Sequence, residues 1–577
     1  MSMRYMKKYL LFAVLASLFM ICEVGMDLSQ PTLMAKIVNQ GVLGESAGGS
    51  PSMEIIRNTG LLMLVIVFCG GMCGILSGVF TNLCAQKSGN DIRKDCFRRI
   101  MHFSFQQTDD FTPGSLITRI TSDVTQVQNM ISQLVRGVVR CLMFLAGGSI
   151  MLSTLDLHFM TVLVIAVPLI LVEIAVILHK ADPLFMLLQR RLDRMNNIVE
   201  ENVAGARVVK AFAQEDHERE RFSDANQKLV KTQMDVLVLM AWMSPLMNIV
   251  LNLSTVAVIK IGGLEAAAGA LEAGSVIAAV TYLTQILNAM NMLAMLFQTF
   301  SRGKASERRL QEVLDTFPVI NDGKASCEKK ERGSVVFSHV SFHYPGFDEM
   351  ILKDINLEIR PGEMLAITGE TGSGKSTLIN LIPRFYDVCE GSVMVDGVDV
   401  RDWKISDLRD AVSVVMQKSE LFSTDIKDNI ERGKRGAGDD EIREAAEAAQ
   451  ADSFIRSQKE GYDTPVTENG MSLSGGQKQR IAVARGILHG GEILILDDAT
   501  SALDLITEAG LHKAVREKYR NMTRIVIAQR AATIMRADRI AVLDGGRIIA
   551  CDTHENLLET CSLYREICRS QSLEAVE

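Results

Sequence analysis

Six long apolar segments before residue 303 constrain the fold of this chain more than any other feature of its sequence. They cover roughly residues 9–29, 58–84, 133–153, 158–179, 235–261 and 274–298. A helix needs about 20 mostly apolar residues to cross the hydrocarbon core of a bilayer, so the sequence predicts six membrane-spanning helices. The first segment follows a basic start but precedes no small-residue cleavage site, which favours a retained span over a signal peptide.

Basic residues indicate the orientation of these spans. Lysines and arginines gather before the first segment and in the long connections after the second and fourth. Such residues mark the cytosolic side, so both ends of the region are expected in the cytosol. The connection after the fifth segment carries Glu265 and Glu272 and no basic residue, as expected outside. The long internal connections mix charged and apolar residues at helical spacing, which predicts helices that extend beyond the bilayer.

The composition changes at Phe317. Residues 317–333, FPVINDGKASCEKKERG, contain proline, glycine and many charges, which is typical of a linker. Apolar strands and helical segments then follow each other to the end of the chain. The predicted organisation is a six-helix all-α transmembrane domain at 1–316, a linker at 317–333 and an α/β P-loop domain at 334–577.

Charge and cysteine content exclude some classes of function. The net charge is −8 and the sequence shows no basic face, which argues against nucleic acid as a partner. Eleven cysteines are scattered without metal-binding spacing, so we interpret them as reduced structural residues rather than as disulfides or zinc ligands.

A glycine-rich stretch, GETGSGKST, matches the pattern GxxxxGK[ST] between an apolar strand and a helical segment. Backbone N–H groups of such a loop bind phosphate oxygens. Lys375 is expected to reach the β- and γ-phosphates of ATP, and the Ser376 hydroxyl to bind Mg²⁺. The predicted nucleotide-binding residues of this stretch are Gly369, Glu370, Thr371, Gly372, Ser373, Gly374, Lys375, Ser376 and Thr377.

A second motif, ILILDD, is an apolar run that ends in two carboxylates. A buried strand of this kind presents a Mg²⁺ ligand at its carboxyl end, and we expect Asp497 to be that ligand. Any buried strand can end in aspartate, so the motif gains its weight from its place about 120 residues after the phosphate loop.

The string LSGGQKQR matches the signature motif of ATP-binding cassette (ABC) proteins, and six spans followed by one cassette resemble a half-transporter of the type IV, multidrug-type ABC exporters. The resemblance covers the whole chain. It implies that Tyr344 stacks on adenine, that Gln417 senses Mg²⁺ and contacts the membrane domain, and that Asp504 faces the other subunit. It also implies an acidic residue of the X-loop at Glu468 and coupling helices around residues 112–124 and 201–215.

The signature motif implies a second subunit. Its serine and glycines are expected at the start of a helix, where backbone N–H groups attract anions. In this family that helix start faces the γ-phosphate held by the opposite subunit, so the resemblance implies two cassettes that enclose two ATP molecules. The residues expected to complete the partner's site are Leu473, Ser474, Gly475, Gly476 and Gln477.

Two residues depart from the family pattern at the catalytic position. Active members usually carry Glu where this chain has Asp498, and His where it has Gln529. Aspartate is shorter by on the order of 1.5 Å, and a misplacement of that size can cost about a hundredfold in rate. Glutamine can hydrogen-bond a γ-phosphate but cannot become cationic.

Both departures fall on one site, which predicts a degenerate site that binds ATP and hydrolyses it slowly or not at all. The favoured interpretation is an asymmetric heterodimer in the cytoplasmic (inner) membrane, with the N-terminus and the cassette in the cytosol, which exports its substrate by alternating access. Hydrolysis would then occur mainly at the site that this chain's intact signature completes.

Other interpretations stay open to different degrees. The alternative is a homodimeric multidrug or lipid exporter in which both changes are tolerated, since Asp is a carboxylate and Gln orients water in some GTPases. A non-transporting ABC protein conflicts with the six spans, and importers normally keep membrane and cassette domains on separate chains. The cargo is open among drugs, lipids, peptides and metal complexes, although the absence of an N-terminal peptidase domain weakly disfavours a peptide.

Polar residues inside the spans are candidates for substrate contacts. Glu23, Asp27 and Glu173 either recognise cations or, as we prefer, pair with basic residues or lie near the interface. Span six carries a polar face that either lines a substrate path or hydrogen-bonds to other helices. That face consists of Thr281, Thr284, Asn288, Asn291, Met295 and Gln298.

Overall fold

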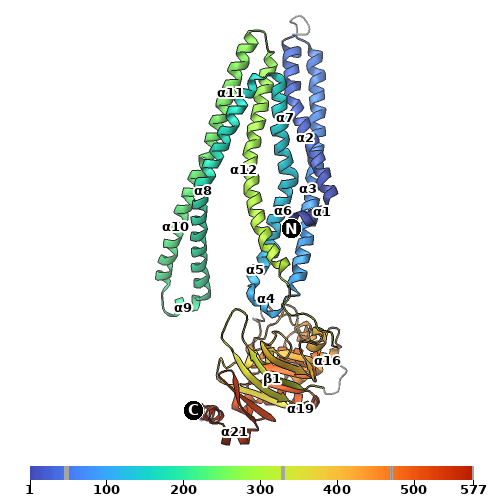
Figure 1. Ribbon diagram of the computed structural model, residues 1–577, viewed down its shortest axis with the longest axis vertical. Helices are drawn as coiled ribbons and strands as arrows, with labels where there is room; N and C mark the ends of the chain where they lie inside the picture. The colour runs from blue at the N-terminus through green and yellow to red at the C-terminus, as the bar shows by residue number, and fades with distance from the viewer. Residues whose placement is uncertain (45–50, 326–331, 468–469, 471, 575–577) are drawn as a thin grey trace. The chain divides into compact units, whose positions relative to one another are not determined.

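The computed structural model of the chain describes residues 1–44, 51–325, 332–467, 470 and 472–574. The chain forms two compact units (Figure 1). The first contains Met1–Met101 and Pro113–Thr316, and the second contains His102–Thr112 and Phe317–Glu577. A short segment of the amino-terminal half therefore packs with the carboxy-terminal half.

Long helices make up the first unit. Among the described residues, six helical stretches are long and apolar enough to cross a membrane, which confirms the six predicted spans. They contain 33 to 53 residues, whereas about 20 suffice to cross a bilayer, so they extend beyond it. The elements are α1 Ser2–Lys7, α2 Leu10–Lys36, η1 Ile37–Val42, α3 Met53–Ile100, α5 Pro113–Thr118, η2 Arg119–Asp123, α6 Val124–Ser132, η3 Gln133–Gly137, α7 Val138–Leu155, α8 His158–Ala204, α9 Ala206–Ala211, α10 Glu215–Ala241, α11 Met243–Ala267 and α12 Ala273–Asp315.

A buried seam joins α2, α7, α8, α11 and α12. Tyr282 of α12 is fully buried there, and its hydroxyl lies 2.6 Å from both the Thr32 hydroxyl and the Leu28 carbonyl, so its polar atom is satisfied. A Cβ added at Gly148 would lie 2.7 Å from Ile286. Span three therefore approaches span six closely at a small residue, as membrane helices commonly do.

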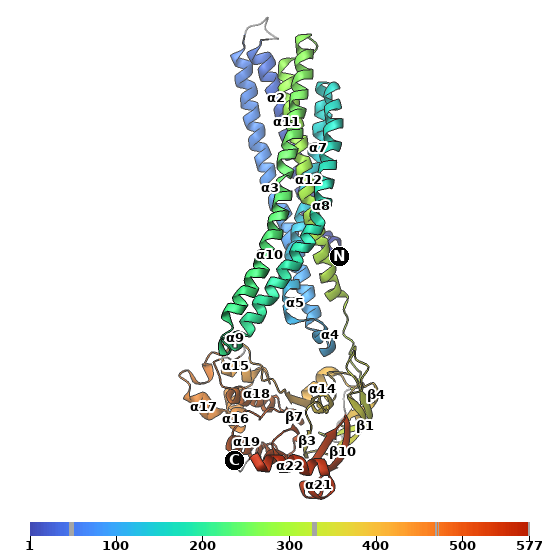
Figure 2. The same ribbon diagram turned by 90° about the vertical axis from the view of Figure 1, so that its left-hand side faces the viewer.

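The two long connections between spans end differently. Helices α8 and α10 run side by side to the short α9 at their tip, and all three belong to the first unit (Figure 2). The tip of the other connection, α4 Phe105–Asp110, belongs to the second unit.

The second unit is an α/β fold, which confirms the predicted fold class. Its described strands form a six-stranded sheet in the order β10-β9-β3-β8-β7-β6, parallel except for β10, and a four-stranded antiparallel sheet in the order β2-β1-β4-β5. All residues of β7 and β8 are buried. Parallel strands are covered on both faces, which explains why these two read as continuous apolar runs.

The elements of the second unit alternate between strands and helices, as the sequence predicted. They are β1 Val335–Phe342, β2 Leu352–Ile359, β3 Met364–Gly369, α13 Lys375–Asn380, β4 Glu390–Val395, β5 Val398–Asp399, α14 Ile405–Ala411, β6 Val412–Val415, α15 Ile426–Glu431, α16 Asp439–Ala448, α17 Asp452–Ser457, η4 Gly461–Asp463, α18 Gly475–His489, β7 Ile493–Asp497, α19 Leu505–Lys518, β8 Thr523–Ile527, α20 Ala531–Ile534, β9 Arg539–Asp544, β10 Arg547–Asp552, α21 His554–Thr560 and α22 Ser562–Glu574. This order places one predicted motif after each of four neighbouring strands, β3, β8, β7 and β6.

Candidate functional site

The predicted site residues follow four neighbouring strands of the large sheet. Strands β3, β8, β7 and β6 are consecutive in the sheet. β3 leads into the phosphate loop, β8 into Gln529, β7 into Asp498 and β6 into Gln417. Because parallel strands end at the same edge of a sheet, motifs that are far apart in the sequence come together there.

The phosphate loop depends on glycine at its start. Gly369 has φ +149°, and a Cβ there would lie 1.9 Å from the Leu543 carbonyl oxygen, so only glycine fits. Lys375 Nζ donates to the carbonyls of Gly369 and Glu370 at 2.9 and 2.6 Å, which folds the lysine back over the loop. Burial lowers the pKa of Lys375, and the carboxylate of Asp497 opposes that shift.

The two expected Mg²⁺ ligands lie in contact. The Ser376 hydroxyl donates to Asp497 Oδ1 at 3.0 Å, and the Asp497 carboxylate is buried. Burial raises the pKa of Asp497, and the Ser376 hydrogen bond opposes that shift. A hydroxyl and a carboxylate beside a phosphate loop are hard oxygen ligands, so this pair fits Mg²⁺.

Asp498 has a constrained backbone, and its side chain is one methylene shorter than that of glutamate. Its φ is +46°, and its N–H donates to the Ile527 carbonyl at 3.1 Å on the neighbouring strand. Burial raises the pKa of Asp498, while a hydrogen bond from the Gln417 side chain lowers it. The structure therefore brings Asp498 and Gln417 together, with the carboxylate held by the amide.

Gln529 lies two residues after β8, on an exposed loop next to the Asp498 strand. The adjacent Arg530 donates to the carbonyls of Ser501 and Leu503 at 2.9 and 2.5 Å, and to the buried Glu508 at 3.1 Å. Nothing in the sequence indicated the contact between Arg530 and Glu508. An acidic residue in the first turn of a helix is usually exposed, and Glu508 lies in the first turn of α19.

Tyr344 lies at the phosphate loop. Its hydroxyl is 3.2 Å from Thr377 Oγ1, and its ring meets the edges of Phe342 and Tyr386 at centroid distances of 5.1 and 5.2 Å. The ring is half-buried. An aromatic face in this position suits a nucleotide base that enters beside the phosphates.

The signature residues begin a helix, as expected. Ser474 is the N-cap of α18, its Oγ accepts from the Gln477 N–H at 3.3 Å, and the Gln477 side chain accepts from the Ser474 N–H at 2.8 Å. Leu473 is buried just before the cap. This capping box leaves the N–H groups of Gly475 and Gly476 at an exposed helix start that suits an anion.

Asp504 caps the start of a helix in the described chain. It is the N-cap of α19, and its carboxylate accepts from the Ile506 and Thr507 N–H groups at 3.1 and 2.9 Å. These bonds lower the pKa of Asp504, with the Thr507 N–H as the largest cause. Glu468, the expected acidic residue of the X-loop, lies outside the described residues.

Helix α4, just before the expected coupling residues 112–124, contacts the segment after α13 within the second unit. Phe105 of α4 stacks on Phe385 with ring centroids 4.1 Å apart, and Tyr386 donates to Asp109 at 2.6 Å. Both partners follow α13 directly, so α4 rests on the segment behind the phosphate loop. The aromatic RFYD stretch at 384–387 was the signal that could have indicated it.

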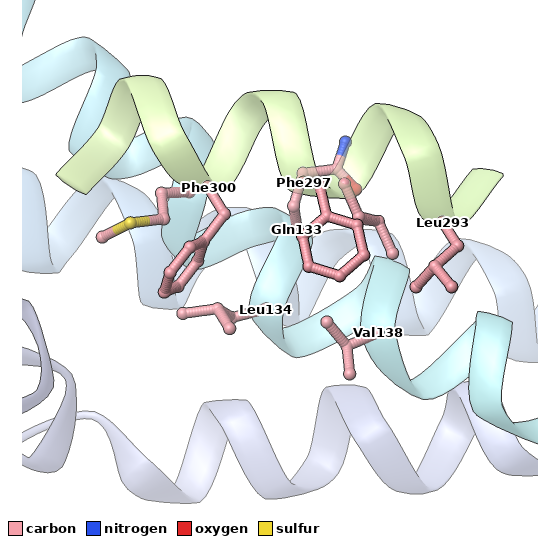
Figure 3. A pocket seen from close by; sticks show the side chains of 8 residues that line it. Gln133, Leu134, Val138, Leu293, Phe297 and Phe300 are labelled. Carbon is pink, nitrogen blue, oxygen red and sulfur yellow. The ribbon is translucent and has the colours of Figure 1, made fainter. Parts of the chain in front are cut away.

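The first unit contains an apolar pocket of about 240 Å³. Figure 3 shows side chains of α12, among them Phe297 and Phe300, facing Leu134 and Val138 of η3 and α7. Gln133 supplies an amide beside this apolar surface. The residues of span six that line the pocket differ from those of its predicted polar face, where the hydroxyls of Thr281 and Thr284 bond to carbonyls of their own helix.

One intramembrane carboxylate has a basic neighbour. Glu23 Oε1 lies 3.6 Å from Arg140 of α7, as the pairing interpretation expected. Glu173 Oε1 is buried and has no hydrogen-bond partner among the described residues.

Comparisons with known proteins agree with this architecture. Family models described as "ABC transporter transmembrane region" and "ABC transporter" match residues 13–290 and 352–501. The chain is 35% identical over 570 residues to the uncharacterized ABC transporter ATP-binding protein YfiB of Bacillus subtilis, covering 99% of this chain and 98% of that relative. It is 33% identical over 519 residues to the ATP-dependent lipid A-core flippase of Syntrophus aciditrophicus, covering 90% of this chain and 86% of that relative.

A solved structure extends the likeness to three dimensions. It is described as a bacterial Atm1-family ABC exporter with ATP bound, and it shares 27% identity with this chain at a TM-score of 0.83. The similarity covers 98% of this chain and 99% of that one.

Proposed function

This chain belongs to the ABC transporter family and has the fold of an exporter, and from that premise we propose that it is one half of an asymmetric export dimer. It is a multi-pass membrane protein with an ATP-binding domain, and its family couples ATP hydrolysis to transport. In the proposed function its own site holds ATP, and its signature completes the hydrolytic site of a second ABC half. The proposed location is the cytoplasmic membrane, with the cassette in the cytosol.

The contact between Ser376 and Asp497 beside the phosphate loop carries the nucleotide part of the proposal. These two residues would hold Mg²⁺, which would offset the negative charge of the phosphates. Lys375 would turn from the carbonyls of its own loop to the phosphates. Gln417 would stay beside the same cluster through Asp498.

Lys375→Ala should weaken the binding of Mg·ATP by about a hundredfold, because the phosphates lose their buried cationic partner. Equilibrium titration with a fluorescent ATP analogue measures this. Lys459→Ala removes an exposed lysine of the same unit and should leave the affinity unchanged. Equal affinities for the two variants would contradict the assignment of the loop.

Asp498 and Gln529 support the degenerate character of the site. A general base must come within about 2.6–3.2 Å of the proton it takes, directly or through one water. The Asp498 backbone is fixed by its bond to Ile527, so the shorter side chain cannot be compensated by a shift of the strand end. The amide of Gln529 stays neutral at all pH values.

Two features support a second subunit. The α18 start presents N–H groups at an exposed anion-binding position of the cassette, where a phosphate of another subunit would complete the site. At the tip of α8 and α10, Val208 and Phe212 are 60% and 72% exposed. Exposed apolar residues at the end of a cytosolic helical hairpin suit docking onto the partner's cassette.

Co-expression with the second half and purification of the pair test the proposal directly. The pair should hydrolyse ATP, and this chain alone should do so at least tenfold more slowly. Rapid hydrolysis by this chain alone, lost on Asp498→Asn, would favour the homodimeric alternative.

The α4 contact should transmit the state of the nucleotide to the spans. Phe105→Ala removes the stack on Phe385, and aromatic pairs of this kind contribute about 0.5–1.5 kcal/mol beyond their buried area. We expect ATP affinity to stay the same and ATP-dependent efflux of an apolar fluorescent dye from vesicles to fall about tenfold. Ile549→Ala, which trims an exposed residue of β10, is the control. A parallel loss of ATP affinity would mean that the contact only supports the fold.

The apolar pocket supports an apolar or amphipathic substrate, such as a lipid or a drug. Its lining offers Phe297 and Phe300 for dispersion contacts and Gln133 for a hydrogen bond. The lipid A-core flippase of Syntrophus aciditrophicus is a relative whose name gives a lipid cargo. Stimulation of the ATPase of the pair by a panel of lipids, drugs and peptides would identify the class.

A further inference from the structure

Three metal-ligating side chains meet at one end of the membrane unit. Asp156 lies in the turn between α7 and α8, His158 begins α8, and Glu265 lies near the end of α11. His158 Nδ1 is 2.9 Å from Asp156 Oδ1 and 3.0 Å from Glu265 Oε1. One ligand atom from each residue lies within 4.8 Å of the other two. The three atoms thus surround a common point.

Two carboxyl groups and one imidazole meet in this cluster. The carboxyl groups of Asp156 and Glu265 also interact directly with each other. Two carboxylates at such a distance repel unless a proton or a cation lies between them. Glu265 Oε2 is buried and, in the part of the chain that the structure describes, receives no hydrogen bond. A buried oxygen without a donor is costly, and a metal ion would satisfy it.

The distances allow a metal ion. In an octahedral site with bonds of about 2.1 Å, neighbouring ligand atoms on one face are about 3.0 Å apart. The two imidazole–carboxylate distances, 2.9 and 3.0 Å, match that edge and equally match direct hydrogen bonds from the ring. One imidazole with two carboxylates favours a divalent transition ion over Ca²⁺ or Mg²⁺, which prefer oxygen ligands alone. The His158 side chain is 69% exposed, so an ion from solution has access.

We propose that Asp156, His158 and Glu265 bind a divalent transition-metal ion, for which Zn²⁺ and Co²⁺ serve as probes. The ion joins the turn between spans three and four to the end of span five. It leaves coordination positions open to water, because the chain supplies three ligands. In the orientation proposed above the site faces the outside of the cell, so external metal would brace these span ends.

Zinc titration of the metal-depleted, tag-free chain in detergent tests the site. Calorimetry should show that His158→Ala and Glu265→Gln bind Zn²⁺ at this site about a hundredfold more weakly than the unmodified chain. Glu54→Gln removes an exposed carboxylate at the start of α3, on the same side of the membrane by connectivity, and should bind like the unmodified chain. Co²⁺ should give a visible absorption band that His158→Ala loses.

Thermal melting distinguishes a loss of zinc binding from a loss of folding. In EDTA each of the four proteins should give one cooperative melting transition, and Zn²⁺ should raise the melting temperature only of the unmodified chain and Glu54→Gln. Equal zinc affinity in all four would overturn the site. A melting difference already present in EDTA, without any zinc dependence, would also overturn it, because a shared proton would then hold the cluster. Neither outcome bears on ATP binding or export. In sealed right-side-out vesicles an impermeant chelator should remove the ion.

Discussion

Asp498→Glu together with Gln529→His should raise ATP hydrolysis at this chain's own site by about a hundredfold. The added methylene extends the carboxylate toward the water beyond the γ-phosphate. The bond from the Asp498 N–H to the Ile527 carbonyl keeps the strand end in place, so the gain in side-chain length is not lost to backbone motion. The imidazole, when protonated, adds a cationic donor that glutamine cannot supply.

The single variants should each recover only part of that rate. Asp498→Glu supplies the base without the cation and should give about a tenfold increase. Gln529→His alone should give less, because the water still lacks a well-placed base. Arg530, which donates to the carbonyls of Ser501 and Leu503 and to Glu508, is unchanged in all variants and continues to hold the loop that carries residue 529.

Vanadate trapping of photoactive ATP on this chain measures the effect, because vanadate replaces the leaving phosphate only where hydrolysis occurs. Asp498→Gln with Gln529→His is the matched control, since it keeps the size of the introduced side chain and removes the base. If the double variant traps no more nucleotide than the unmodified chain, another feature of the site limits the rate. If the unmodified chain already traps strongly, the site is not degenerate.

Periodicity and motif order were sufficient to predict the six spans, the α/β class and the start of α18 at the signature, because each depends on local sequence. An apolar run of about 20 residues is compatible with few structures other than a membrane-spanning helix. A GxxxxGK[ST] loop between a strand and a helix usually adopts one phosphate-binding conformation. The expected position of Asp497 at the carboxyl end of a buried strand followed from the same local pattern.

The side-chain networks could not be predicted in this way, because they depend on pairs that are remote in the sequence. Tyr386 meets Asp109 across 277 positions, and neither residue type marks a contact by itself. In the sequence, His158 is only a residue at the start of a helix and Glu265 only an acid outside the membrane. Their contact is visible only in the structure, where the start of α8 meets the end of α11. Glu508 resembles an exposed acid at a helix start, and only its bonds to Arg530, Thr500 and Thr533 reveal that it is buried.

Gly475→Asp in this chain should reduce ATP hydrolysis by the assembled pair by about a hundredfold or more, while Asp498→Asn changes it less than about twofold. The variant should fold, since a Cβ at Gly475 would lie 3.6 Å from Ala502 Cβ, an ordinary contact. Gly476 is less suitable, because a Cβ there would lie 2.9 Å from the Ala502 carbonyl oxygen.

The effect of Gly475→Asp follows from charge. The N–H groups at the start of α18 attract an anion, and a carboxylate on the first residue of that helix would occupy the same field and repel the partner's γ-phosphate. Gly475→Ala has the same added Cβ without the charge, and it should lower the rate much less. Steady-state phosphate release by the purified pair measures all three variants. Equal losses from Gly475→Asp and Asp498→Asn would mean that both sites hydrolyse ATP alike, and the asymmetric arrangement would then be wrong.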